Sequence, residues 1–262
     1  MTQKELPLIL VSNDDGVDAP GIQNLIETLV VFAKVVVVAP NGPQSAKSHA
    51  MSINQALYYQ EVTPSNSHQN LKVYSCSGTP VDCIKLALHG ILEQKPDLCV
   101  SGINHGSNHG INVIYSGTMA AALEAGMSGI PAIGFSLLDY DYHANFKPGL
   151  KYVKEIVMKV LENKLPKDVV LNVNIPKLPE NKIKGIKVCR QIQSRWEETI
   201  DIHEFPMKQH YYWLSGTFLT QEPNTCMDTD HWALENGYVS VVPTQFDFTA
   251  HAFKKELENW NW

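Results

Sequence analysis

The junction between an apolar run and an acidic pair near the start of the chain is the feature that most limits its fold. Pro7 to Ser12 reads as a buried strand and stops abruptly at residues 13–16, which are Asn-Asp-Asp-Gly. Pro20 suits a first helical position, and apolar residues then recur at helical spacing as far as Leu29. A strand, an acidic loop and a helix within about 30 residues are typical of an open α/β sheet, where ligands bind beyond the carboxyl ends of the strands.

The two adjacent carboxylates, Asp14 and Asp15, need a compensating group. At a separation of about 4 Å they repel by roughly 4 kcal/mol if the effective dielectric constant is about 20. A divalent cation is the simplest compensator, which makes both residues candidate metal ligands and catalytic groups. The alternative is a purely local role, because Asp-Gly is a common turn dipeptide and acids favour helix N-termini.

Size and charge limit the class of protein. The chain has 262 residues, of which 44% are apolar and 18% are charged, as expected for one large α/β domain with or without an appendage. No apolar run reaches the roughly 18 residues that cross a bilayer, and the first residues lack the layout of a secretion signal, so we expect a cytoplasmic protein without membrane contact. The net charge of −6 argues against binding to duplex nucleic acid.

The five cysteines are scattered and include no C-x-x-C pair. They are Cys76, Cys83, Cys99, Cys189 and Cys226. Because four of them lie in apolar or strand-like runs, we expect buried reduced thiols in place of a zinc cluster or a disulfide framework.

Strand-like and amphipathic segments alternate along most of the chain. Strands are expected at 7–12, 34–40, 71–76, 97–101, 131–136, 169–175 and 237–242, and helices at 20–29, 79–93, 116–127, around 152–160 and at 250–260. This alternation favours a mostly parallel sheet with helices on both faces. We therefore expect an α/β core over residues 1–180 and an extension over residues 181–262. Alternating, aromatic-rich residues 185–218 of the extension predict hairpins that form an arm for pairing with another subunit.

Three further loops follow predicted strands and could meet the acidic pair. The first contains Ser45, whose hydroxyl is a candidate ligand for a hard cation or, alternatively, a helix cap. The second, residues 102–112, has glycine at every fourth position and polar amides between, which lets the backbone approach a ligand closely. The third begins a helix at Ser116, where free N–H groups favour an anion, although a plain capping role is equally open.

Six ordered motifs resemble the SurE family of survival-protein-E-type nucleotidases. They are Ser-Asn-Asp-Asp-Gly-Val-x-Ala-Pro-Gly-Ile at 12–22, Ser-Gly-Thr-Pro-Val-Asp-Cys at 77–83, Pro-Asp-x-x-Val-Ser-Gly-Ile-Asn at 96–104, Tyr-Ser-Gly-Thr at 115–118, Gly-Ile-Pro-Ala-Ile at 129–133 and Leu-Asn-Val-Asn-Ile-Pro at 171–176. The resemblance implies a Rossmann-like core with a hairpin-rich C-terminal extension. It also implies a metal-dependent phosphatase that hydrolyses nucleoside 5′- and 3′-monophosphates.

The resemblance further implies which residues form the site. The metal ligands would be Asp14, Asp15, Ser45 and Asn104, and the phosphate pocket would include Asn108, Ser116, Gly117 and Thr118. An all-oxygen ligand set suits one Mg²⁺ or Mn²⁺ ion per subunit and does not suit zinc. The C-terminal half would contribute an exchanged segment to a homodimer or homotetramer. Asn112 departs from the family, which usually has Asp at that position.

Other interpretations remain open at this point. Haloacid-dehalogenase-type phosphatases use D-x-D-G after a first strand, but the leading position here is Asn13, which cannot form an aspartyl-phosphate. A non-catalytic nucleotide-binding protein with a structural metal is the alternative from another functional class. His49, His105 and His109 are candidate acids or bases by residue type, although a loop histidine is more often simply solvated.

Overall fold

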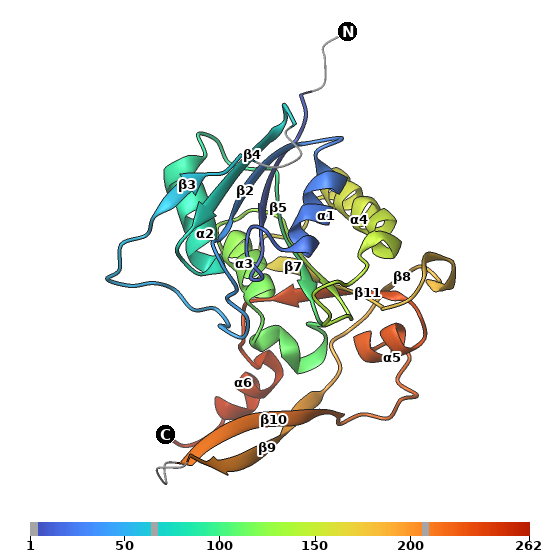
Figure 1. Cartoon of the computed structure of the whole chain (residues 1–262). Helices are drawn as coiled ribbons and strands as arrows, with labels where there is room; N and C mark the ends of the chain where they lie inside the picture. The colour runs from blue at the N-terminus through green and yellow to red at the C-terminus, as the bar shows by residue number, and fades with distance from the viewer. Residues whose placement is uncertain (1–4, 64–67, 206–209) are drawn as a thin grey trace.

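A computed structural model describes residues 5–63, 68–205 and 210–262. Within these residues a nine-stranded sheet has the order β3-β4-β2-β1-β5-β6-β7-β11-β8 (Figure 1). Its strands are β1 (Leu8–Ser12), β2 (Lys34–Pro40), β3 (Tyr59–Glu61), β4 (Leu71–Cys76), β5 (Leu98–His105), β6 (Ala132–Leu137), β7 (Val169–Ile175), β8 (Ile186–Val188) and β11 (Val239–Gln245). The run from β4 to β7 is parallel throughout, which confirms the expected mostly parallel sheet.

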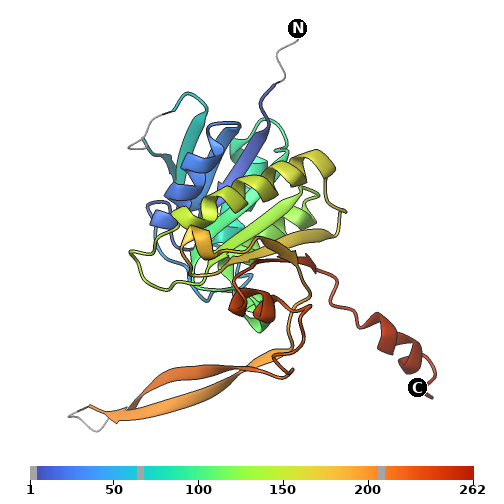
Figure 2. The same ribbon diagram turned by 90° about the vertical axis from the view of Figure 1, so that its right-hand side faces the viewer.

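Helices cover both faces of this sheet, as the alternating sequence predicts. Helices α1 (Pro20–Leu29) and α4 (Leu150–Asn163) pack together on one face, and α2 (Pro80–Leu86) and α3 (Gly117–Met127) pack together on the other (Figures 1 and 2). Each pair seals its own apolar cluster against the sheet. The central strands are continuous apolar runs for this reason, because a parallel strand is buried on both of its faces.

The C-terminal extension contributes strands to the same sheet. Strand β11 lies antiparallel to β7 and parallel to β8, so two strands from beyond residue 180 complete one edge. The short elements β3, β8 and α5 (Asp230–Glu235) were not expected from sequence. They are too short for a hydrophobic period to be read, and their positions depend on neighbours distant in the chain.

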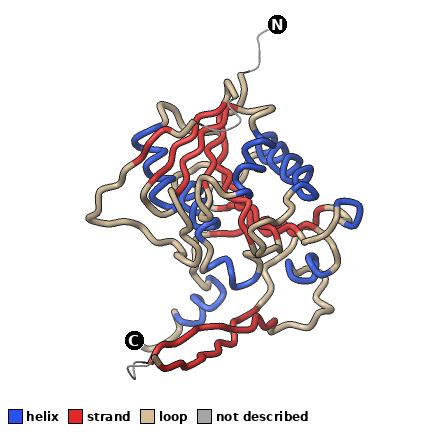
Figure 3. The backbone as a smooth tube through the Cα atoms, in the orientation of Figure 1, coloured by secondary structure: helices blue, strands red, loops and turns tan. Residues whose placement is uncertain are grey.

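A long hairpin projects away from the sheet. It consists of β9 (Ser194–Glu204) and β10 (His210–Thr220), which pair antiparallel along eleven residues each and stand apart from the core in Figure 2. The hairpin expected between residues 185 and 218 is thus present. The tube in Figure 3 shows the chain leaving the sheet for this arm and returning to it, and the last helix, α6 (His251–Leu257), lies outside the sheet.

The cysteine side chains lie in the buried environments expected for most of them. Cys76, Cys83, Cys99 and Cys189 are buried, Cys226 is half-buried, and all five are free thiols. Of the helices that the structure describes, none combines the length and apolar character required to cross a bilayer.

The sheet order determines where a site can form. Strands β2, β1 and β5 are adjacent and parallel, with Val11 opposite Val37 and Ser12 opposite Ser101. Their carboxyl ends therefore lie side by side, and the loops that follow them emerge at one edge. The acidic loop, the loop with Ser45 and the glycine-rich loop are brought together in this way.

Candidate active site

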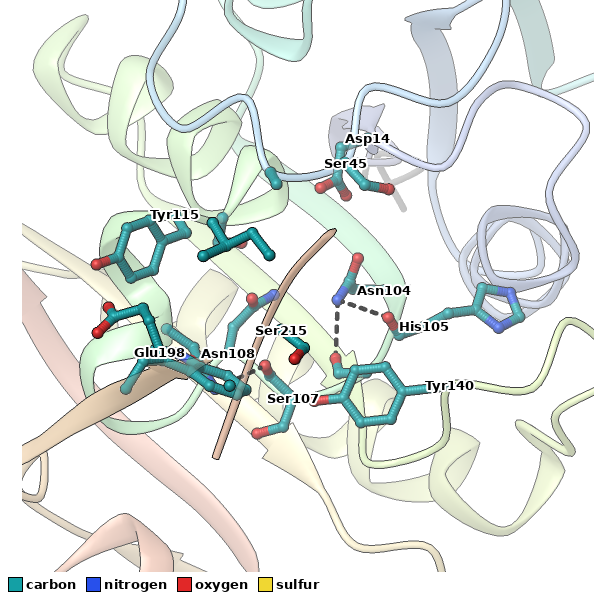
Figure 4. Close-up of a pocket in the computed structure, with 17 residues that line it drawn as sticks. Asp14, Ser45, Asn104, His105, Ser107, Asn108, Tyr115, Tyr140, Glu198 and Ser215 are labelled. Atoms are coloured by element: carbon teal, nitrogen blue, oxygen red, sulfur yellow. Dashed lines mark hydrogen bonds between the residues drawn. The ribbon is translucent and has the colours of Figure 1, made fainter. Parts of the chain in front are cut away.

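A cavity of about 520 Å³ opens at this edge of the sheet. Its walls come from the ends of β1 and β5, from the loop after β2, from the start of α3 and from the base of the arm (Figure 4). Asp14, Ser45, Asn104, Asn108 and Ser116, all named by sequence reasoning, line it. Segments that are distant in sequence thus meet around one space large enough for a small organic phosphate.

Asp14 is the buried acid of this cavity, with 4% of its surface exposed. Its Oδ1 accepts a hydrogen bond from the hydroxyl of Thr118, which is fully buried on α3. Its backbone oxygen accepts a hydrogen bond at 2.7 Å from the N–H of Gln44, in the loop after β2. Burial first, and then the charge of Asp15, raise the pKa of Asp14 to about 6. A cation beside such a buried carboxylate strongly stabilises its ionised form.

Gly117 allows α3 to start directly against this acid. A Cβ atom at position 117 would lie 2.7 Å from the Cβ and 2.9 Å from the Oδ2 of Asp14, closer than side chains pack. The absence of a side chain therefore lets Thr118 reach the Asp14 carboxylate. Because helix N-termini carry a partial positive charge, the same approach stabilises negative charge at this point.

Asp15 lies next to the cavity and is not part of its wall. One of its carboxylate oxygens accepts the backbone N–H of His105 at 3.2 Å. Burial raises the pKa of Asp15, and the hydrogen bond from His105 opposes that increase. The two acids therefore differ in position. Asp14 faces the cavity, whereas Asp15 is hydrogen-bonded to the end of β5.

Ser45 faces Asp14 from the loop after β2, and Asn104 faces it from the end of β5. The Asn104 amide nitrogen donates to the backbone oxygens of His105 and Gly106, at 3.1 and 2.8 Å, so its oxygen turns toward Asp14 and Ser45 (Figure 4). The Ser45 loop is held against the α3 region by Ser48, whose N–H and hydroxyl donate to the backbone oxygens of Tyr115 and Ile114.

These donors fit a hard divalent cation. A carboxylate, a hydroxyl and an amide oxygen converge on one side of the cavity, and oxygen donors of this kind suit Mg²⁺ or Mn²⁺. In the part of the chain that the structure describes, no group of three or more His, Cys, Asp or Glu side chains is arranged to hold a metal. The oxygen donors of Asp14, Ser45 and Asn104 fit magnesium or manganese better than a softer ion.

The predicted phosphate residues fall into two positions. Asn108 and Ser116 line the cavity, and both are buried. Asn108 is fixed by its side-chain bond to the Ser136 hydroxyl at 2.8 Å, and Ser116 caps α3 by accepting the N–H of Met119 at 3.0 Å. Gly117 and Thr118 lie behind Asp14, outside the cavity wall, where they position the carboxylate.

The three candidate histidines lie in different environments. His105 lines the cavity, but its ring points away from Asn104, and its Nδ1 lies 2.9 Å from the backbone oxygen of Asp141 (Figure 4). His49 is ion-paired with Glu124, outside the cavity wall. His109 is buried behind the wall, where its Nδ1 is hydrogen-bonded to the hydroxyl of Ser107.

The base of the arm forms a wall of the cavity that sequence reasoning missed. Trp196, Glu198, Leu214, Ser215 and Gly216 contribute to it. The indole N–H of Trp196 donates to the Asn112 side-chain oxygen at 2.8 Å, which ties the arm to the glycine-rich loop. The aromatic-rich pattern of the arm was the available signal, but nothing local indicates that the arm returns to this edge.

Comparisons with known proteins agree with this architecture. The family model described as "Survival protein SurE" matches residues 9–198. A protein named 5′-nucleotidase SurE from Christiangramia forsetii is 58% identical over 258 residues, with 98% of each chain covered. Another of that name, from Flavobacterium psychrophilum, is 57% identical over 97% of this chain and 98% of its own. The crystal structure of the SurE protein from Aquifex aeolicus is 38% identical and aligns with a TM-score of 0.81 over 96% of this chain and 98% of that one. The chain belongs to the SurE family.

Proposed function

We propose that this protein is a metal-dependent phosphomonoesterase that hydrolyses nucleoside 5′-monophosphates, and also 3′-monophosphates, to nucleoside and phosphate. The names of its relatives support the 5′-nucleotidase activity. The observation that carries the proposal is the buried Asp14 carboxylate, which faces a cavity together with the oxygens of Ser45 and Asn104.

Asp14, Asp15, Ser45 and Asn104 would hold one Mg²⁺ or Mn²⁺ ion. When bound, such an ion neutralises negative charge on the phosphoryl group and orients water for attack. Asn108 and Ser116, both in the cavity wall, would bind the phosphoryl oxygens, and the N-terminal N–H groups of α3 would stabilise the charge that develops on them.

The remaining wall supports a nucleoside leaving group. Tyr115, Tyr140 and Trp196 offer aromatic surface beside the polar end of the cavity, which suits a flat base. Glu198 adds a carboxylate that can accept hydrogen bonds from ribose or base donors. The arm thus forms the part of the site that contacts the nucleoside portion of the substrate.

The arm also supports self-association as a homodimer or homotetramer. Ile200 and Ile202 pair across the hairpin with Leu214 and Tyr212 and so share one face. Their exposures range from 58% to 72%. An apolar face of this kind favours burial against a second copy of the chain. The cytoplasmic location expected from sequence stays a prediction.

Phosphate release tests the proposed activity. The protein, freed of metal by chelation, is given nucleoside 5′- and 3′-monophosphates with Mg²⁺, Mn²⁺, Zn²⁺ or chelator alone. We expect release with Mg²⁺ or Mn²⁺, and a loss of at least about 100-fold in Asp14→Asn. Asp18→Asn, which alters an exposed acid of the same loop, is the matched control. A protein that binds nucleotide without metal-dependent release would be the non-catalytic alternative.

A further inference from the structure

A chain of hydrogen-bonded side chains leads from the cavity wall into the C-terminal extension. We propose that Ser107, His109 and His231 form a proton relay that protonates the leaving oxygen of the nucleoside during hydrolysis. The inference rests on the proposed function and adds residues that the metal and phosphate groups leave unused.

Ser107 is the end of the relay that meets the substrate. It lines the cavity, and Figure 4 shows it across the space from Asp14 and Ser45. In the proposed reaction, a phosphoryl group held near Asp14 would have its ester oxygen on this side. The Ser107 hydroxyl contacts the Nδ1 of His109 and donates its proton at rest to the side-chain oxygen of Asn174, at 3.3 Å.

His109 and His231 continue the chain away from the cavity. The Nε2 of His109 lies 3.2 Å from the Nδ1 of His231, and the two ring planes are inclined by only 16° with centroids 5.4 Å apart. His109 is buried, whereas His231, at the start of α5, is half-buried. The relay thus runs from an enclosed hydroxyl to a ring that solvent reaches.

Asp230 holds this arrangement in place. It is fully buried, and its oxygens accept the backbone N–H groups of Gly110, Ile192 and His231, at 2.9, 2.9 and 2.8 Å. These bonds join the glycine-rich loop, the approach to the arm and α5 at the point where the two rings meet. Asp230 is therefore a positioning residue for both histidines.

The chemistry of the rings suits proton transfer without a lasting charge. Burial lowers the pKa of His109 to about 4, with Asp230 opposing the decrease and His231 adding to it. His109 is consequently a neutral ring at pH 7, with one N–H to donate and one nitrogen to accept. A neutral imidazole of this kind passes a proton from one nitrogen while receiving another.

The transfer balances in protons and electron pairs. As the bond from phosphorus to the leaving oxygen breaks, that oxygen keeps the electron pair and takes the Ser107 hydroxyl proton. Ser107 takes the Nδ1 proton of His109, whose Nε2 takes the Nδ1 proton of His231, and the Nε2 of His231 takes a proton from water. The attacking water releases one proton to solvent. This release balances the proton that His231 takes from solvent, so the net proton count is unchanged.

The test uses leaving groups that differ in their need for a proton. A nucleoside alkoxide is a poor leaving group, whereas p-nitrophenolate leaves without protonation. We expect Ser107→Ala and His109→Gln each to lower kcat on the nucleoside monophosphate by about 100-fold and to leave kcat on p-nitrophenyl phosphate within about threefold. Phe218→Leu is the control, because Phe218 packs 4.9 Å from the His109 ring and carries no exchangeable proton.

Each outcome decides the proposal. Equal losses on both esters would mean that these residues only support the loop, and unchanged nucleotide turnover would mean that no proton passes through them; either result overturns the relay. If the variants fail to fold, the wild-type protein still decides, because the relay requires a larger solvent deuterium effect on the nucleotide than on p-nitrophenyl phosphate. A wild type that hydrolyses neither ester contradicts the proposed function itself.

Discussion

The central sheet and the projecting arm stabilise their strands in opposite ways. Every residue of β1 is buried, because helices cover both faces of the sheet. Most residues of β9 and β10 are exposed, and within the described part of the chain each of these strands pairs with the other alone. Both regions nevertheless form walls of the same cavity. The sheet edge thus supplies enclosed polar groups to this cavity, and the arm supplies more exposed groups.

This division leads to a clear expectation for substitutions. Changes at the sheet edge should alter turnover or folding even in an isolated subunit, because its groups are enclosed and shared among several elements. Changes on the outer arm should leave the isolated subunit folded and should alter assembly. Four substitutions test this contrast.

The sharpest test on the core side is the metal-free stability of Asp14→Asn. A folded-state pKa raised from 3.8 to about 6 means that ionising Asp14 destabilises the fold, so stability is lost as pH rises from about 4 to about 6. In chelator at pH 8, we expect Asn to raise the free energy of unfolding by about 3 kcal/mol, and at pH 4 to change it little. Urea unfolding at the two pH values measures this. An equal difference in unfolding free energy between variant and wild type at pH 4 and pH 8 would contradict this prediction.

Gly117→Ala tests how tightly α3 approaches the acid. The added Cβ would lie 2.7 Å from the Asp14 Cβ and displace the carboxylate. We expect phosphate release to fall by about 100-fold, the effect of a small misplacement of a reacting group. Gly42→Ala, in the neighbouring loop, is the control, because its Cβ would meet nothing within 4 Å. Similar activity in both variants would show that the contact does not position Asp14.

Ile202→Glu tests the arm side of the comparison. Ile202 is 64% exposed on the apolar face, and a buried charge there would oppose docking of a second copy. We expect sedimentation velocity to show self-association weakened at least about tenfold, or about 1.4 kcal/mol, with the subunit still folded. Asp201→Asn, at the neighbouring position on the opposite face, should change nothing. An unfolded variant would break the proposed separation of roles.

Glu124→Gln should have the smallest effect. Burial raises the pKa of Glu124, but hydrogen bonds from Lys85 and His49 outweigh it and hold the pKa below 4.5. A lowered pKa contributes stability at neutral pH that is lost as pH falls through the folded-state value. Because Lys85 and His49 are partly exposed, we expect a loss of only about 0.5–1 kcal/mol at pH 7, shrinking near pH 4. Chemical denaturation measures it, with exposed Glu93→Gln as control.

Much of the core could be predicted because its signals are local. The strands from β1 to β7, apart from the three-residue β3, and helices α1 and α4 follow from apolar runs and helical spacing. The strand order was not predicted: the structure places β2, β1 and β5 side by side, and this adjacency brings Asp14, Ser45 and Asn104 to one edge. Helix α2 is shorter than the predicted 79–93, because its last part is a separate wider turn over Ala87–Ile91.

The order of the elements, the two-sided burial of the sheet and the oxygen-bearing residues at its edge could be predicted from sequence. These features depend on hydrophobic periodicity and turn residues, which are patterns among residues close together in the chain. Three hydrogen bonds of the site could be known only from the tertiary structure. They join Thr118 to Asp14, Trp196 to Asn112, and His109 to His231. The last pair is separated by 122 positions. Contacts of that range depend on how the arm and α5 pack against the sheet, and no local pattern of residues encodes that packing.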